Sequence, residues 1–231
     1  TQRAYIRNNP RTRLLRNSHR DWLYTRRHTV TTALTASALR GYLQRECPPQ
    51  LLTPEVLSAL GAQLLFTNGI LTCDTFGDSS LLHRPMRPVV CHRKDKGLFP
   101  QQKARCLDEA ARGAVLVSAR IAKGEQAIID EALHHGFAVV LIADNGLPDR
   151  YHPSAARLDL CAAGRLLLLT PWQYKYRGKD EQVTVSFCKA MNCLTQALSR
   201  KKDSWWKTTD PPLSGYITTR QRSSSHQRLV T

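Results

Sequence analysis

The stretch GAVLVSARIAKGEQAIIDEALHHGFAVVLIADNG (113–146) decides the fold. It contains two continuous apolar runs, AVLVS at 114–118 and FAVVLIA at 137–143, on either side of the helical segment GEQAIIDEALHHG at 124–136. Continuous apolar runs of this length are typical of strands buried on both faces. A strand, a helix and a second strand in this order predict two parallel strands joined by a crossover helix.

The same alternation of apolar runs and helical segments continues on both sides of this unit. Further strands are predicted at 70–76, 88–92 and 165–170, and further helices at 35–46, 53–65, 103–113 and 186–199. Right-handed crossovers between such strands lead to a doubly wound, Rossmann-like fold of the α/β class, with a mainly parallel sheet covered on both faces.

The sequence divides into four regions. A basic helical N-terminal segment at 1–27 precedes a helical linker at 28–68, and a Rossmann-like domain at 69–200 precedes a basic tail at 201–231. The tail is rich in Ser, Thr, Pro and Arg. Because such a composition cannot bury enough apolar surface to fold, it predicts disorder.

Charge is concentrated at the two ends of the chain. The formal net charge of the 231 residues is +16; residues 1–27 carry +7 and residues 199–231 carry +5. Basic ends on a near-neutral body favour a polyanionic partner, most often nucleic acid, although charge runs that are merely solvated remain the alternative. Neither end has the bulky apolar face of a membrane-surface helix, and no run of 18 apolar residues exists, so we expect a cytoplasmic protein without membrane contact.

Cofactor motifs and metal-ligand spacings are absent from the sequence. The seven cysteines include no CxxC pair and no zinc set with a neighbouring His, which predicts thiols in the core of a protein from a reducing compartment. No GxGxxG or GxxxxGK[ST] motif occurs, so neither a dinucleotide nor a nucleoside triphosphate is expected as a cofactor.

The loops that follow the predicted strands hold the candidate site, because ligands of such sheets lie beyond the carboxyl ends of the strands. Ser118 and Gly124 flank a strand-to-helix turn, where helix N–H groups can hold a phosphate. Basic and aromatic side chains here would contact the backbone and bases of an unpaired strand; the alternative is a set of ordinary exposed loop residues. The predicted binding residues at this edge are His92, Arg93, Lys94, Ser118, Arg120, Lys123, Gly124, Asn145, Gly146, Arg150 and Tyr151, with His152 and Trp172 as further stacking candidates.

Residues 88–198 resemble the family of DNA processing protein A (DprA/Smf). PVVCHRK (88–94) stands where that family has its first strand and a Gly-Ser-Arg turn, and 109–136 resembles the strand, turn and helix that follow. FAVVLIADNGLPDRYHPSAARL (137–158) is similar to the next strand with its Gly-Leu-Asp…Tyr-Pro segment, and CKAMNCLTQAL (188–198) to a helix of the family. The resemblance implies a DprA-like Rossmann domain that grips single-stranded DNA. A homodimer stays open as its assembly.

The first 27 residues resemble the REP-associated single-tyrosine HUH transposases. AYIRNNP (4–10) and RDWLY (20–24) are similar to that family's YIxxNPV…DW segment. The resemblance implies that Tyr5 attacks a DNA phosphate and that Asn9 helps to hold a divalent metal, Mg²⁺ or Mn²⁺, if a His-hydrophobic-His motif lies upstream. Without that motif no cofactor is expected. The DNA contacts predicted in this segment are Arg7, Arg11, Arg13 and Arg16.

Together these features predict a transposase-related DNA-binding protein of a mobile element. The chain begins on Thr1 rather than Met, so we expect a fragment whose upstream catalytic part is missing and which binds DNA without cutting it. Two alternatives stay open. One is a stand-alone DprA-like recombination mediator without chemistry, and the other is a nucleotide-processing hydrolase on the same fold.

Overall fold

The computed structural model describes residues 29–91, 98–149, 151–176 and 183–202, together with Arg13, Leu14 and Ser18. The predicted tail beyond residue 202 and nearly all of the N-terminal segment lie outside the described residues. Within the described part no helix is long and apolar enough to cross a membrane.

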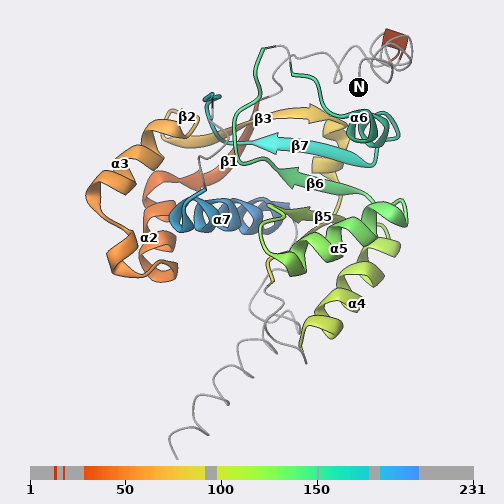
Figure 1. Cartoon of the computed structure of the whole chain (residues 1–231), viewed down its shortest axis with the longest axis horizontal. Helices are drawn as coiled ribbons and strands as arrows, with labels where there is room; N and C mark the ends of the chain where they lie inside the picture. Colours follow the sequence, from red (N-terminus) through yellow and green to blue (C-terminus); the bar gives the residue numbers. More distant parts are fainter. Residues whose placement is uncertain are drawn as a thin grey trace, which may run out of the picture.

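A single sheet of seven strands organises the described residues (Figure 1). The strands follow the order β1-β3-β7-β6-β5-β4, and β2 pairs with β3 beside this path. The parallel half consists of β4 (Met86–Pro88), β5 (Val115–Ser118), β6 (Val139–Ile142) and β7 (Leu166–Thr170). The antiparallel half consists of β1 (Val30–Thr35), β2 (Phe66–Thr67) and β3 (Ile70–Gly77).

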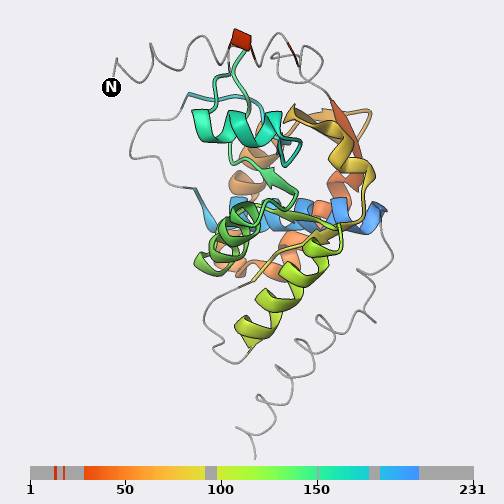
Figure 2. The same cartoon turned by 90° about the vertical axis from the view of Figure 1, so that its right-hand side faces the viewer.

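Helices cover both faces of the sheet. On one face lie the crossover helices α4 (Leu98–Ala111), α5 (Lys123–His134) and α6 (Ala155–Ala162), which follow one another in the order of the strands they connect (Figures 1 and 2). On the other face lie α2 (Ala36–Glu46), α3 (Pro54–Gln63) and α7 (Val185–Lys202). Two short 3₁₀ helices, η1 (Pro49–Leu51) and η2 (Ser79–His83), complete the connections.

The apolar runs explain why two cores form. Successive side chains of a strand point to opposite faces of a sheet. In β5, Val115 and Val117 belong to the core under α2, α3 and α7, whereas Leu116 belongs to the core under α4, α5 and α6. Strands that must fill both cores therefore consist of continuous apolar residues, as β6 and β7 also do.

The α/β class, the parallel strands and the covering of both faces are confirmed. The sequence does not predict the strand β1 of the antiparallel half. This strand lies inside the region 28–68, for which the sequence predicts a helical linker, and it pairs with β3. Its sequence, VTTALT, is rich in β-branched residues, which favour strands. The region also contains the two predicted helices, and Thr53 caps α3 by accepting a hydrogen bond from the Val56 N–H.

The structure contains a helix that the sequence does not predict, because α6 lies between the strands predicted at 137–143 and 165–170. The helix begins after Ser154, whose hydroxyl accepts a hydrogen bond from the Arg157 N–H. Only Leu158 and Cys161 of its eight residues are buried, so the helical periodicity in the sequence is too short to recognise. β4 also ends at Pro88, the residue at which the sequence predicts the strand to begin.

Candidate nucleic-acid interface

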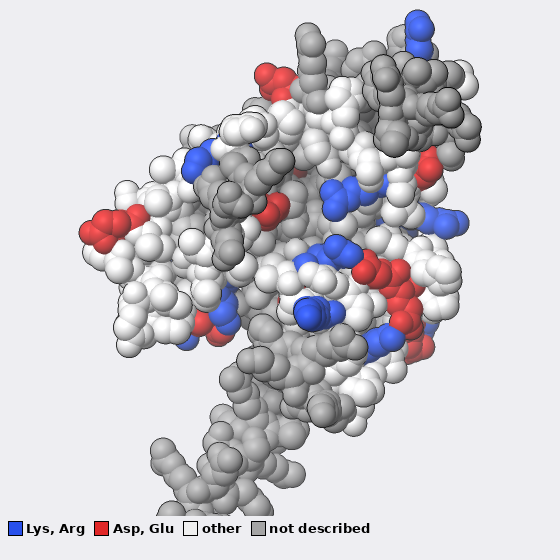
Figure 3. Space-filling model, viewed as in Figure 1, with Lys and Arg blue, Asp and Glu red and all other residues white. Residues whose placement is uncertain are grey.

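A cavity of about 310 Å³ opens at the carboxyl edge of β5 and β6. Its walls come from the turn after β5, the end of β6, α6 and α7, and they include apolar side chains such as Leu141, Ile142 and Met191. Arg120 and Arg157 line it from two separate elements, the β5–α5 turn and α6. Basic side chains gather over the middle of this face, where β6 and α5 lie, next to a group of acidic side chains (Figure 3).

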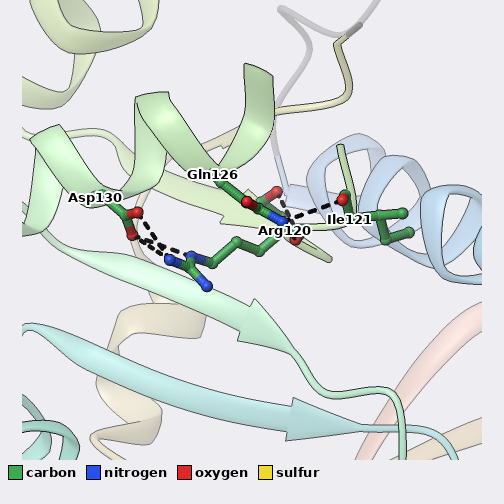
Figure 4. A network of polar contacts seen from close by, with 5 residues as sticks. Arg120, Ile121, Gln126 and Asp130 are labelled. Atoms are coloured by element: carbon green, nitrogen blue, oxygen red, sulfur yellow. Dashed lines mark hydrogen bonds and ion pairs between the residues drawn. The ribbon is translucent and has the colours of Figure 1, made fainter. Parts of the chain in front are cut away.

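Arg120 occupies a constrained turn. Its φ of 53° lies in the left-handed region of backbone conformation. Residues other than glycine adopt this conformation only when neighbouring contacts hold them there. The Arg120 N–H donates to Ser118 Oγ at 2.9 Å, and Gln126 Nε2 donates to the Arg120 carbonyl at 3.3 Å (Figure 4). The backbone of Arg120 is therefore fixed on both sides.

The guanidinium of Arg120 forms an ion pair with the carboxylate of Asp130. Its Nε lies 3.0 Å from Asp130 Oδ1, and its Nη2 lies 2.7 and 2.8 Å from the two Asp130 oxygens (Figure 4). Asp130 is an exposed residue of α5. An incoming phosphate must compete with Asp130 for this cation.

Ser118 holds the turn in place from inside the protein. It is completely buried, and its hydroxyl donates to the Val89 carbonyl at 3.1 Å while it accepts from Arg120. Ser118 therefore positions Arg120, whereas the sequence predicts Ser118 as a nucleic-acid-binding residue.

The N–H groups of the same turn are engaged by Glu125. Its Oε2 accepts hydrogen bonds from Ile121 N at 2.8 Å and from Ala122 N at 3.4 Å, and its Oε1 accepts one from Cys91 N at 3.4 Å. Glu125 is only 1% exposed, and burial raises the pKa of its carboxyl while these three hydrogen bonds oppose the increase. The predicted phosphate position at the start of α5 is thus taken by the chain's own carboxyl group. Gly124 is buried beside it, and Lys123 is exposed.

Asn145 and Gly146 attach the chain after β7 to the end of β6. Asn145 Nδ2 donates to the Lys175 carbonyl at 2.7 Å, and Asn145 Oδ1 accepts from Lys175 N at 3.1 Å. A Cβ at Gly146 would lie 2.2 Å from Tyr174 N, so only glycine allows this approach. The sequence predicts both residues as DNA contacts, and the structure uses them to hold a neighbouring segment.

Of the aromatic residues that the sequence suggests, Trp172 and Tyr151 pack against other rings, whereas His152 is exposed. Trp172 is 2% exposed and stacks on Phe187 at 3.9 Å, so it belongs to the core and offers no face to a base. Tyr151 packs edge-on against Phe76 at 5.3 Å, and burial raises its pKa. Tyr174 and Tyr176 are 48% and 83% exposed. The alternation of aromatic and polar residues in WQYKYR (172–177) marks all three rings as candidates but does not distinguish the buried Trp172 from the exposed tyrosines.

Most of the remaining predictions fall on residues that the structure does not describe. Arg13 is described and exposed. Among the described residues, no three His, Cys, Asp or Glu side chains are grouped so that they could hold a metal ion. The predicted residues outside the described part are Tyr5, Arg7, Asn9, Arg11, Arg16, His92, Arg93, Lys94 and Arg150.

The cysteines are free thiols placed in or near the cores, as predicted. Six are buried, and Cys188, which lines the cavity, is partly exposed. Burial raises the pKa of Cys91 and of Cys161 to about 12 and also raises the pKa of Cys188. Thiols with raised pKa values are poor nucleophiles near neutral pH, so Cys188 is not an activated cysteine.

Comparison with known proteins finds a structural likeness. No protein-family model matches the sequence, and no curated protein is significantly similar to it. DNA processing protein A from Helicobacter pylori, which has been described for its single-stranded DNA binding mode, is similar in structure over 76% of this chain and 68% of its own. The two chains share 17% sequence identity, with a TM-score of 0.40.

Proposed function

We propose that the protein binds single-stranded DNA at the carboxyl edge of its parallel strands. The observation that carries this proposal is the cavity that Arg120 and Arg157 both line from different elements, with exposed Lys123 on the turn beside Arg120. We call these three cations and the cavity the edge site. The proposal rests on the charge and shape of this chain alone.

The combination of cations with apolar walls favours an unpaired polynucleotide. Phosphates attract the Arg and Lys side chains, and each neutralised phosphate releases condensed counterions. The apolar walls suit a base, which a double helix keeps inside its stack. The net charge of +16 adds an attraction that acts over a longer range.

Two finer parts of the proposal concern residues outside the described part. Cleavage of DNA by Tyr5, with Asn9 at a divalent metal, needs an upstream HUH domain and stays a prediction, as does the relation to transposases. DprA-like recombination mediation and a homodimer likewise stay predictions. Labelled DNA that becomes covalently attached to the full-length protein with Mg²⁺, but not to its Tyr5→Phe variant, would support the cleavage.

A nucleotide-processing activity is the second candidate. The cavity volume of about 310 Å³ lies at the lower end of the range for small-molecule pockets, so it has room for a single nucleotide. Release of free base from a mononucleotide would favour this candidate. A lack of release, together with tight binding of oligonucleotides, would favour DNA binding.

The test measures binding of a labelled oligonucleotide of about 20 nucleotides at several salt concentrations. The variant Arg120→Gln/Lys123→Gln/Arg157→Gln should bind roughly tenfold more weakly, and the slope of log K against log salt should fall by about 0.7 for each phosphate that is no longer neutralised. The matched control is Arg84→Gln/Arg112→Gln/Arg165→Gln, because these exposed cations lie at the opposite, amino edge of β4, β5 and β7. Equal decreases in affinity in both triple variants would show that the edge site does not bind the DNA.

A further inference from the structure

We propose that Tyr174 and Tyr176 form a platform on which unpaired bases stack beside the edge site. This inference rests on the proposed DNA binding and identifies the part of the ligand that the protein recognises. The edge site would contact phosphates, and the platform would contact bases.

The exposure of the two rings sets them apart from Trp172 and Tyr151 at the same edge. Trp172, two positions earlier, is buried against Phe187, whereas Tyr174 is 48% exposed and Tyr176 is 83% exposed. Leaving two large rings in water is unfavourable unless a ligand covers them, because burial of an aromatic side chain stabilises a protein. A tyrosine ring offers a face that any base can cover.

The segment that carries the rings is anchored through hydrogen bonds to its backbone. Asn145 binds both the N–H and the carbonyl of Lys175, the residue between the two tyrosines. The Thr170 hydroxyl donates to the Asn145 carbonyl at 2.8 Å, and this bond ties Asn145 to the end of β7. Gly146 allows the backbone of Tyr174 to approach closely. Anchoring before binding lowers the entropy cost of ordering a segment around a ligand.

The anchor also places the platform next to the cavity. Asp144, the residue before Asn145, lines the cavity, and so does Val183 on the other side of residues 177–182. A strand whose phosphates lie at Arg120 and Arg157 would thus have its neighbouring bases near Tyr174 and Tyr176. Because stacking does not depend on base identity, we expect little sequence preference.

The decisive experiment compares a normal oligonucleotide with an abasic strand of the same length, which keeps the phosphates and lacks the bases. Wild-type protein should bind the normal strand at least about fivefold more tightly, since stacking on one aromatic residue contributes on this order or more. Tyr176→Ala should remove most of this preference, and Tyr174→Ala part of it. Neither should change the slope of log K against log salt, because the cations that neutralise phosphates are all retained.

Rescue and control variants separate stacking from a general effect on folding. Tyr176→Phe keeps the ring and should keep the preference for the normal strand. Leu51→Ala removes an apolar side chain that is 46% exposed on η1 and should change nothing. Asn145→Ala releases Lys175 and should weaken the preference although Asn145 itself is not expected to touch DNA, so Asn145 is a positioning residue.

The outcomes distinguish the two proposals. If the wild-type protein binds both strands equally well, or if Tyr176→Ala keeps the preference, the platform is refuted while DNA binding stands. If the wild-type protein binds neither strand, the proposed function falls and the platform with it. A preference that depends on Tyr176 and returns with Phe supports both.

Discussion

At the scale of single residues, Glu125 determines what the turn after β5 can bind. A strand-to-helix turn of this kind normally offers its N–H groups to an anion. Here the Glu125 carboxyl group accepts hydrogen bonds from the Ile121, Ala122 and Cys91 N–H groups, so a group of the protein itself occupies these donors. A bound strand would therefore meet the side chains of Arg120, Lys123 and Arg157 rather than the N–H groups of this turn.

The first prediction concerns the pH dependence of stability. Burial raises the pKa of Glu125 above 4.5, the value taken for the unfolded chain, so the folded state holds the proton more tightly. The contribution of Glu125 to the free energy of unfolding is fully present below pH 4.5 and is lost as the pH rises through the folded-state pKa. In Glu125→Gln this decrease in the free energy of unfolding with rising pH should be absent, because the Gln side chain does not titrate. Unfolding in urea between about pH 4 and pH 8, followed by tryptophan fluorescence, measures it.

Glu55 supplies a control of opposite sign. A hydrogen bond with Thr53 lowers the pKa of Glu55, so its contribution is present at higher pH and is lost as the pH falls through the folded-state value. Glu55→Gln should therefore lose stability relative to the wild type at high pH only. If Glu125→Gln and wild type show parallel pH profiles, Glu125 is not the titrating group.

At the scale of secondary-structure elements, α5 both supports and restrains the edge site. Gln126 donates to the carbonyls of Arg120 and Ile121 and holds the turn, whereas Asp130, further along the helix, binds the Arg120 guanidinium. Because the backbone of Arg120 is held in place, only its side chain is free to exchange Asp130 for a phosphate. The exposed position of the pair keeps the cost of this exchange small.

We therefore expect Asp130→Asn to bind single-stranded DNA about two- to fivefold more tightly than the wild type, because a competitor for Arg120 is weakened. Asp108→Asn is the matched control. It removes the same charge from a comparable pair between Asp108 on α4 and Arg112 just after this helix, and it should change affinity much less. Oligonucleotide titration at fixed salt measures both.

The Arg120→Gln background shows whether the effect passes through Arg120. In that background Asp130→Asn should have little further effect, since the two residues act as a pair. A gain of the same size with and without Arg120 would mean that the removal of a negative charge, rather than the release of Arg120, explains the result.

At the scale of the whole molecule, the two ends of the chain carry most of the charge and the sheet carries the site. The segment 1–27 has a net charge of +7, while both cores and the cavity are built from residues 29–202. If the proposed function is correct, long-range attraction and local recognition belong to different parts of the sequence.

Deletion of 1–27 should lower the affinity for every strand by a similar factor and reduce the salt slope by about 0.7 for each phosphate that the segment neutralises. The preference for the normal strand over the abasic strand should not change, because Tyr174 and Tyr176 remain. Titrations of the deleted and complete chains at several salt concentrations test this. Abolished binding after the deletion, together with unaffected binding in the edge-site triple variant, would place the DNA-binding surface in the basic segment.

The sequence by itself determined the unit β5–α5–β6 and the burial of most thiols. These features follow from local patterns, since continuous apolar runs specify buried strands and glycines end the intervening helix. The sequence did not predict the short helix α6 and the strand β1, because each depends on only a few buried residues.

Only the tertiary structure decided what the residues at the carboxyl edge of the parallel strands do. Glu125 binds the N–H of Cys91, Arg120 pairs with Asp130, and Asn145 holds Lys175 across a sequence separation of 30. The same packing buries Trp172 and leaves Tyr176 exposed. Such contacts depend on how separate elements pack against one another, and no local pattern of apolar and polar residues encodes that packing.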